Sequence, residues 1–249
     1  MRSLFSGLIF FASVTVHAQT AAEQIALGDR DYVAMNAAQA LSHYEQAIKA
    51  DGSSYEAFWK ASRSAVDIGS GRSDTKQTEL FSRAEQYARK AVGLNPADAE
   101  GHFALARSLG KTALTQSPKG RIKYATEIRS HALECLRIEP KHAGCLHVMG
   151  MWNAEVMRLN GFTRMIAKNF LGGKVFGSAS WAEAVRYMEA SVASEPDRII
   201  HRVDLAEVYV DVKQPEKARA QAEAALRLPV SDVNDEAYKA QARALLGRL

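Results

Sequence analysis

The chain repeats a pattern of small and apolar positions that predicts pairs of antiparallel helices. In the second helix of each pair, small or apolar residues stand at positions i, i+4 and i+7, and in three segments a Pro follows five positions later. Small side chains let two helix axes approach closely, and Pro ends a helix. The five matching segments are Ala40/Tyr44/Ala47/Gly52, Ala84/Ala88/Ala91/Pro96, Ile128/Ala132/Cys135/Pro140, Ala184/Met188/Ser191/Pro196 and Ala218/Ala222/Ala225/Val230.

The first helix of each pair carries a small residue at its eighth position, which fixes the register a second time. A period near 34 residues with small residues at fixed places is typical of tetratricopeptide repeats. We therefore predict an all-α fold, a tetratricopeptide-like α-solenoid with a right-handed superhelix, eleven or more helices and no sheet. The small residues are Gly28, Ser62, Ala106, Gly150 and Ala206; the predicted repeats lie near 21–54, 55–98, 99–142, 143–198 and 199–232, with a capping helix at 233–249.

The fourth repeat contains the longest insert between its two helices. An apolar stripe at roughly helical spacing runs through it and ends at Leu171-Gly172-Gly173, with basic residues between the apolar ones. We interpret the stripe as an extension that faces the core. The alternative is a helix on a membrane surface, which needs a basic face beside an apolar one. The stripe comprises Val156, Phe162, Ile166 and Phe170, and the basic residues are Arg158, Arg164 and Lys168.

The first eighteen residues have the pattern of a secretory signal peptide. Arg2 precedes an apolar run from Leu4 to about Val16, and small residues before a cut after Ala18 suit a signal peptidase. The run is too short to cross a bilayer with ease, which disfavours a membrane anchor. We expect residues 1–18 to be removed and residues 19–249 to form one repeat domain in the periplasm or outside the cell.

Several segments together resemble the regulator of microtubule dynamics family. They are FWKASRSAVD at 58–67, GRIKYATEIRSHALECLRIEP at 120–140, LHVMGMW at 146–152, and FTRMIAKNFLGG followed by SWAEAVRYMEASVASEP. They come in that family's order and with similar spacing. The resemblance implies a tetratricopeptide-like helical array without enzyme activity and, for eukaryotic members, association with microtubules or organelle membranes.

Charge and motifs exclude several functional classes. The chain has 32 Lys and Arg against 28 Asp and Glu, a formal net charge of +4, which is too small to predict nucleic-acid binding. No His-Glu-x-x-His, Gly-x-Ser-x-Gly or dinucleotide fingerprint occurs. Gly110-Lys111-Thr112 resembles the end of a phosphate-binding loop, but the required earlier Gly is Leu105. We therefore predict no catalytic residues and no cofactor.

One group of His and Cys residues could serve as zinc ligands. Zinc accepts both residue types. Cys135, however, stands at the Ala position of its repeat, where a buried Cys at a helix crossing is expected. We therefore assign no metal site, and a metal-dependent enzyme is the weakest alternative. The group comprises His131, Cys135, His142, Cys145 and His147.

The two cysteines lie nearly symmetrically about the turn at Pro140-Lys141. Antiparallel helices that meet at this turn would bring Cys135 and Cys145 close together. An exported protein could oxidise them, so the sequence indicates a possible disulfide.

First helices line the inside of a tetratricopeptide superhelix, so their positions five, nine and twelve predict a binding groove. An aromatic residue followed four positions later by Arg recurs in two adjacent repeats. Aromatic residues and Arg carry much of the binding energy of interfaces, and Arg holds carboxylates. We expect a non-catalytic scaffold that binds a protein or peptide with an acidic group or free C-terminus; the alternative is a peripheral membrane adaptor that uses the fourth repeat's insert. The candidate groove residues are Tyr32, Trp59, Arg63, Phe103, Arg107, His147 and Met151.

Overall fold

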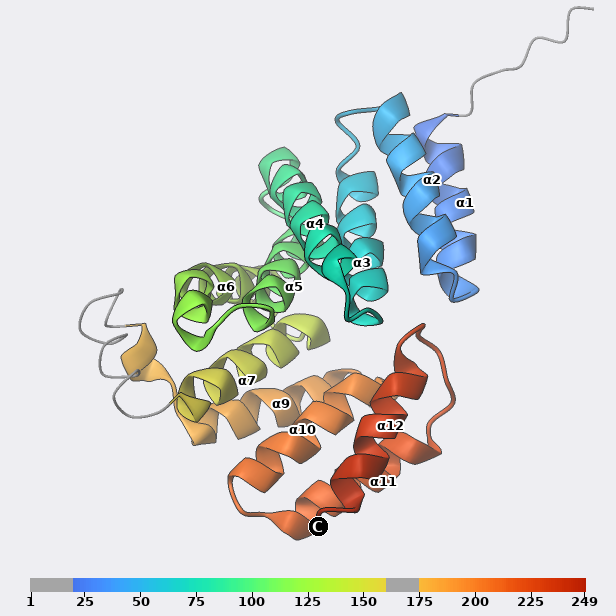
Figure 1. The fold of residues 1–249 in the computed structure, drawn as a ribbon. Coiled ribbons are helices and arrows are strands. Elements are labelled where there is room, and N and C mark those ends of the chain that lie inside the picture. Colours follow the sequence, from blue (N-terminus) through green and yellow to red (C-terminus); the bar gives the residue numbers. More distant parts are fainter. Residues whose placement is uncertain (1–19, 160–174) are drawn as a thin grey trace, which may run out of the picture.

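The protein is all-helical, as the sequence predicts (Figure 1). The structure, a computed structural model, describes residues 20–159 and 175–249. These ranges contain eleven α-helices, one short 3-10 helix and no strand. The helices are α1 (Ala21–Val33), α2 (Ala37–Ala50), α3 (Tyr55–Ser70), α4 (Thr75–Leu94), α5 (Ala99–Leu114), α6 (Pro118–Ile138), α7 (Ala143–Arg158), η1 (Phe176–Ser178), α9 (Trp181–Ser194), α10 (Ile199–Asp211), α11 (Pro215–Arg227) and α12 (Asp235–Leu246).

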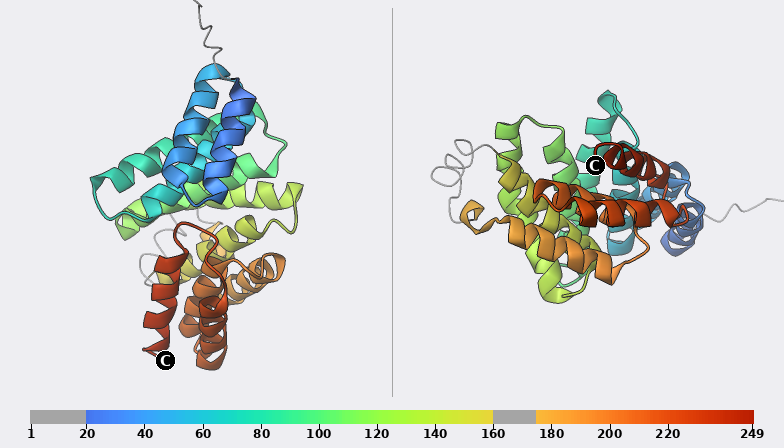
Figure 2. Two further views of the ribbon diagram at one scale, coloured as in Figure 1. Left: turned by 90° about the vertical axis from the view of Figure 1, so that its right-hand side faces the viewer. Right: turned by 90° about the horizontal axis from the view of Figure 1, so that it is seen from below.

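The helices pack as consecutive antiparallel pairs. The pairs are α1 with α2, α3 with α4, α5 with α6, α7 with α9, and α10 with α11, while α12 covers α10 and α11. Each first helix begins at the residue where a predicted repeat begins. The first pair lies at one end of the array and the last helices lie at the other (Figure 2).

Proline sets the end of three second helices. The residue before Pro is pushed out of the helical region by a clash with the proline ring. Asn95, Glu139 and Glu195 each precede a Pro, and each lies outside the helical region with φ between −142° and −129°. The chain therefore turns into the next repeat at these three places.

The eighth position of each first helix sets how closely the pair packs. A Cβ atom on Gly28 would lie 2.5 Å from the Tyr44 ring, and one on Gly150 would lie 2.5 Å from the Met188 side chain. Where the first helix instead carries Ser62, Ala106 or Ala206, the matching residue of the second helix is Ala88, Ala132 or Ala222, and all six are fully buried. The second helix thus carries a large residue at the crossing only where the first helix carries Gly, which keeps each crossing filled.

The C-terminal part of the array reaches back to the second repeat. The Asn234 side-chain amide donates a hydrogen bond to the backbone carbonyl of Asp67, at 3.0 Å. In Figure 1 the loop between α11 and α12 points toward the end of α3. This contact closes one side of the concave surface, which an isolated row of helix pairs would leave open.

Two sequence predictions lie largely outside the described residues. They are the signal peptide at 1–18 and the central part of the apolar stripe, with Phe162, Arg164, Ile166, Lys168 and Phe170. Val156, the first stripe residue, is buried in a core cluster with Trp152. None of the helices in the described ranges has the length and apolar character needed to cross a bilayer.

A candidate binding cavity on the concave surface

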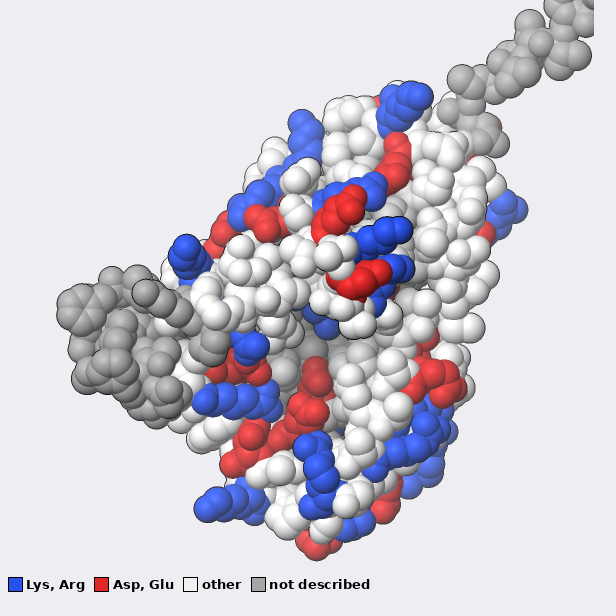
Figure 3. Space-filling model, viewed as in Figure 1, with Lys and Arg blue, Asp and Glu red and all other residues white. Residues whose placement is uncertain are grey.

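A cavity of about 420 Å³ lies on the concave side of the array. Its wall combines residues of α1, α3, α5, α6, α7, α10 and α12 with the segments that precede α9 and α10. In Figure 3 the surface is hollowed between the part of the molecule that carries α3 to α5 and the part that carries α9 to α12. The volume is within the range of pockets that hold small ligands or a few side chains.

One wall contains a buried ion pair. Asp67 of α3 has a fully buried side chain, and its carboxylate accepts hydrogen bonds from the Arg107 guanidinium at 2.5 Å and the Tyr32 hydroxyl at 2.9 Å. Burial opposes the charge on Arg107, but Asp67 outweighs this effect and raises the pKa of the guanidinium. Burial and the Asp67 charge likewise raise the pKa of Tyr32. The charge of Arg107 is therefore already matched within the protein.

Arg63 lies beside this ion pair, but it packs against aromatic rings instead of a carboxylate. Its guanidinium carbon is 3.6 Å from the centre of the Tyr32 ring and 5.1 Å from that of Trp59. The guanidinium makes a 3.4 Å hydrogen bond to the Tyr44 hydroxyl, while its buried Nε atom has no hydrogen-bond partner among the described residues. Arg63 therefore borders the cavity without a carboxylate partner of its own in the described ranges.

Lys111 is a second cation of the wall, one helical turn after Arg107 on α5. In the described part of the chain, its ammonium group makes no hydrogen bond and has no carboxylate within ion-pairing distance. Burial, followed by the nearby charge of Arg107, lowers the pKa of Lys111. A half-buried amine without a partner is a position where an anionic ligand group would be stabilised.

The opposite wall is apolar. Trp152 of α7 donates a hydrogen bond from its indole nitrogen to the Ala125 carbonyl at 2.7 Å, and its ring stacks against Phe176 with centroids 6.2 Å apart. Met151 and Val148 extend this wall along α7, and all of these residues contact the cavity. The cavity thus offers one charged and one apolar side to a ligand.

A histidine pair forms part of the cavity wall between α7 and α10. The rings of His147 and His201 stack with centroids 4.7 Å apart, and the His147 Nε2 atom lies 2.7 Å from the Asp204 carboxylate. His201 is 5% exposed, and its Nδ1 atom has no hydrogen-bond partner in the described residues. Burial, followed by the charge of His147, lowers the pKa of His201 well below its ordinary value.

Six of the seven residues predicted for the groove contact this cavity. Trp59 does not; it packs beside Arg63 and against the core cluster that contains Trp152. Sequence reasoning missed Lys111, although it continues the four-residue spacing of Phe103 and Arg107. The predicted residues that contact the cavity are Tyr32, Arg63, Phe103, Arg107, His147 and Met151.

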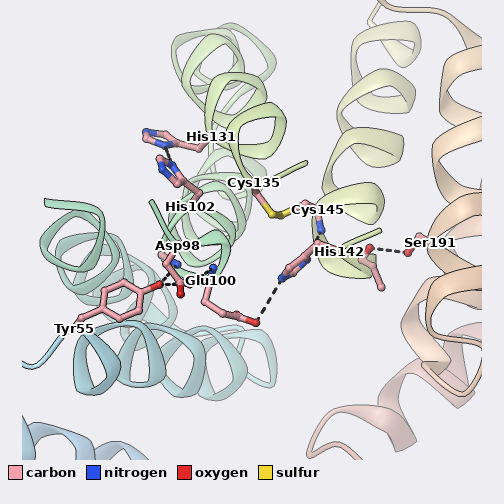
Figure 4. The surroundings of a disulfide bond; sticks show 11 residues. Tyr55, Asp98, Glu100, His102, His131, Cys135, His142, Cys145 and Ser191 are labelled. Atoms are coloured by element: carbon pink, nitrogen blue, oxygen red, sulfur yellow. Dashed lines mark hydrogen bonds and ion pairs between the residues drawn. A yellow bond between two sulfur atoms is a disulfide. The ribbon is translucent and has the colours of Figure 1, made fainter. Parts of the chain in front are cut away.

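The turn between α6 and α7 carries a disulfide. Cys135 and Cys145 are bonded, with their Cα atoms 6.4 Å apart, and both side chains are fully buried. His142 lies between them in sequence and is the N-cap of α7, where its Nδ1 atom accepts a hydrogen bond from the Cys145 backbone amide at 3.1 Å. Figure 4 shows the His142 ring between the disulfide and Glu100, whose carboxylate is 3.5 Å from the Nε2 atom.

The other histidines of the predicted cluster have different partners. His131 faces His102, with their Nδ1 atoms 2.8 Å apart, and His147 faces Asp204. In the described ranges, only His142 brings a ligand nitrogen close to both sulfur atoms, all three atoms lying within 4.8 Å of one another. The disulfide uses both sulfur atoms, so the oxidised protein has no thiolate ligand here.

Comparison with known proteins identifies the family of this chain. A family model described as "Regulator of microtubule dynamics protein 1-3" matches residues 25–249. The chain belongs to this family. It is 26% identical over 161 residues to Regulator of microtubule dynamics protein 1 of Bos taurus, and 26% identical over 196 residues to that of Mus musculus. These alignments cover 64% and 76% of this chain but only 49% and 62% of the relatives, so this family member spans about half to three fifths of their length.

Solved structures show the same fold as this family member. A thermophilic TPR protein of Thermus thermophilus superposes with a TM-score of 0.65 at 20% identity, covering 90% of this chain and 99% of that one. The pilF protein of Pseudomonas aeruginosa gives a TM-score of 0.55 at 14% identity, covering 92% and 90%. The fold is therefore tetratricopeptide-like.

Proposed function

We propose that this protein is a non-catalytic, exported helical-repeat scaffold that binds an acidic or C-terminal segment of a partner peptide in its concave cavity. The observation that carries the proposal is Lys111, a cation in the cavity wall without an ion-pair partner among the described residues. A carboxylate of the ligand would supply the missing partner, and an ionic hydrogen bond of this kind contributes about 1.5–3 kcal/mol.

A second cation of the cavity wall supports a carboxylate rather than a neutral ligand group. Arg63 borders the same cavity without a carboxylate partner in the described ranges, whereas Arg107 is bonded to Asp67. Lys111 and Arg63 therefore replace the Arg63 and Arg107 pair that the sequence predicted as the anion-binding groups. The apolar wall at Met151 and Trp152 would take a hydrophobic side chain of the same ligand.

The size of the cavity limits how much of the partner can enter. The contact between Asn234 and Asp67 closes one side of the concave surface, and about 420 Å³ holds only a few side chains. We therefore propose recognition of a short peptide end or of one acidic side chain with its neighbours, rather than of a long extended segment.

A peptide library with free and amidated C-termini tests this proposal. Fluorescence anisotropy with the full chain should detect peptides whose affinity falls at least tenfold on amidation or on removal of an acidic side chain. Lys111→Met should weaken the same peptides, because the cation that holds the carboxylate is lost. Lys90→Met is the matched control, since Lys90 is exposed on α4 away from the cavity. Equal binding by the Lys111→Met and wild-type proteins would contradict the proposal.

The export of this protein is part of the proposal. The buried disulfide supports it, because disulfides persist in oxidising compartments and are rare in the cytosol. The expected outcome is that mature protein from its native source starts after Ala18 and contains no free thiol. Intact-mass measurement after alkylation checks both points, and a chain that retains residues 1–18 would contradict export with cleavage.

If this protein is exported, it cannot have the activity for which its relatives are named. Those relatives are named as regulators of microtubule dynamics. An exported protein of a cell without extracellular tubulin would not meet microtubules, so we propose a different partner for the shared fold. Co-sedimentation with assembled microtubules checks this, and saturable binding at micromolar protein concentration would restore the microtubule role.

A further inference from the structure

The surroundings of the disulfide contain the atoms of a second possible site. The sulfur atoms of Cys135 and Cys145 and one nitrogen of His142 lie within 4.8 Å of one another, and all three residues are buried. Two thiolates and one imidazole are a ligand set that zinc prefers. In the oxidised protein the bond between the sulfur atoms removes two of these ligands.

The hydrogen bonds of His142 set the protonation of its ring. The Cys145 backbone amide donates to the Nδ1 atom, so Nδ1 carries the lone pair. The Nε2 atom lies 3.5 Å from the Glu100 carboxylate, which favours a proton on Nε2. Metal-binding histidines commonly coordinate through one nitrogen while the other donates its proton to a carboxylate. His142 therefore carries its proton on Nε2, and its Nδ1 lone pair could bind a metal ion only if the ion replaced the hydrogen bond from the Cys145 amide.

The fold already brings these groups together from three helices and a turn. Cys135 is on α6, His142 is the N-cap of α7, Cys145 is in the first turn of α7, and Glu100 is in the first turn of α5 (Figure 4). The packing of α5, α6 and α7 positions them in the oxidised protein.

We propose that the reduced protein binds one Zn²⁺ ion through the Cys135 and Cys145 thiolates and the His142 Nδ1 atom, and that disulfide formation releases it. A dithiol reductant supplies two electrons and two protons, which convert the disulfide to two thiols while the reductant becomes a disulfide. Each thiol then loses its proton to solvent as it binds the ion. In the reverse step a disulfide oxidant accepts two electrons from the two thiolates and, with two protons from solvent, becomes a dithiol while the ion leaves. Zn²⁺ itself is neither oxidised nor reduced. The fourth position of a tetrahedral ion is left to a solvent molecule.

This site needs neither Lys111 nor Arg63, although His142 and Glu100 also border the cavity. It would make metal binding by this protein depend on the redox state of its compartment. Nascent or reduced chains would carry zinc, and oxidised chains would not. Glu100 acts as a positioning residue that holds the His142 ring rather than as a ligand.

Elemental analysis of the full chain tests the inference. Protein purified without a histidine tag is reduced with a phosphine, incubated with ZnCl₂ and freed of unbound metal by gel filtration. We expect about one zinc ion per reduced chain and essentially none per oxidised chain. Cobalt in place of zinc should give the intense visible absorption of a tetrahedral ion with thiolate ligands, which reports the geometry directly.

Four variants separate this site from adventitious binding. Cys135→Ser/Cys145→Ser should bind no zinc. His142→Asn keeps an oxygen that can accept the hydrogen bond at the start of α7 but should weaken zinc binding at least tenfold in competition with a chromophoric chelator. Glu100→Ala should weaken it by about 10–100-fold. His43→Asn, on α2, should leave the affinity unchanged.

Several outcomes would overturn the inference. One is zinc binding by the oxidised protein or by the double Ser variant at the level of the reduced wild type. Another is unchanged affinity in His142→Asn. Circular dichroism keeps the test decisive: a reduced wild-type protein that keeps its helical content but binds no zinc has no such site, and one that loses its helices on reduction has no preformed site.

Discussion

The side-chain amide of Asn234 donates a hydrogen bond to the Asp67 backbone carbonyl, 167 positions away in the sequence. Asn234 is 5% exposed, so water does not replace this contact. Asp67 is at the same time the carboxylate that binds Arg107 and Tyr32. One residue of α3 therefore joins the first repeat, the third repeat and the C-terminal cap around the cavity.

Asn234→Ala should lower the free energy of unfolding by about 1–2 kcal/mol, because a buried backbone carbonyl loses its hydrogen bond. Urea denaturation followed by circular dichroism measures the change in midpoint. Gln46→Ala removes an amide that is exposed on α2 and should change the free energy of unfolding by less than about 0.5 kcal/mol. Equal midpoints for both variants would show that the closure adds no stability.

Arg107→Ala should destabilise the protein by about 3–5 kcal/mol, because it leaves the buried Asp67 carboxylate without its cation. The double change Asp67→Asn/Arg107→Met removes both charges and should restore much of this loss. Arg63→Ala should cost only about 1 kcal/mol, the energy of a cation–π contact. Denaturation of the four proteins tests the order, and similar losses for Arg63→Ala and Arg107→Ala would contradict it.

Gly150→Ala should destabilise the protein by about 1–3 kcal/mol through overpacking. The added methyl group would lie 2.5 Å from the Met188 side chain and 3.1 Å from its backbone nitrogen. The substitution should cost less in a Met188→Ala background, which leaves room for the methyl group, and a double-mutant cycle measures this coupling.

Gly93→Ala provides the control for this helix crossing. Nothing lies within 4 Å of the added methyl group, and Gly93 is in the last turn of α4. This change should stabilise the protein by about 0.5–1 kcal/mol, because Ala favours the helix. A stabilising effect of Gly150→Ala as well would show that the crossing with Met188 is not tight.

Reduction of the disulfide should lower the free energy of unfolding by about 2–3 kcal/mol, because a closed loop of this length restricts the unfolded chain. The two cysteines are 10 positions apart. Thermal denaturation with and without a phosphine reductant, in the presence of a metal chelator, measures the effect. The Cys135→Ser/Cys145→Ser variant should show no response to the reductant, and a wild-type protein that also shows none would refute the prediction.

Stability should fall as the pH drops through about 6.5, the ordinary pKa of the His201 side chain. Burial and the charges of His147, Arg198, Arg107 and His142 lower the pKa of His201 in the folded protein. The unfolded chain then binds the extra proton first, so each pH unit below this point costs up to about 1.4 kcal/mol. His201→Gln should flatten the pH profile measured by urea denaturation.

Two other histidines modify this profile in opposite directions. The pKa of His131 is lowered by burial and by His102, which adds to the loss of stability at acid pH. Burial disfavours the charge on His142, but Glu100 raises the pKa of this side chain overall. The stability that His142 contributes is therefore present below about pH 6.5 and is lost as the pH rises through the pKa of the folded protein. An unchanged slope in His201→Gln would assign the pH dependence to these residues instead.

The local pattern of the sequence determined the helices and the way each pair packs. Gly150 predicts a close crossing with the helix that starts near Ala184, and Pro196 predicts where that helix ends. Both predictions follow from contacts within one repeat. The turn at Pro140 places Cys135 opposite Cys145 for the same reason. Contacts between neighbouring helices follow from helical periodicity, which a single sequence displays.

Only the tertiary structure decided which groove residues are free to bind a ligand. Arg63 and Arg107 occupy equivalent positions in adjacent repeats, yet only Arg107 has a buried carboxylate partner, Asp67, among the described residues. The contact of Asn234 with Asp67 depends on the curvature that all the repeats accumulate together. Small rotations between repeats set this curvature, and no local pattern encodes their sum. The cavity and the unpaired amine of Lys111 in the described array are therefore properties of all the repeats together.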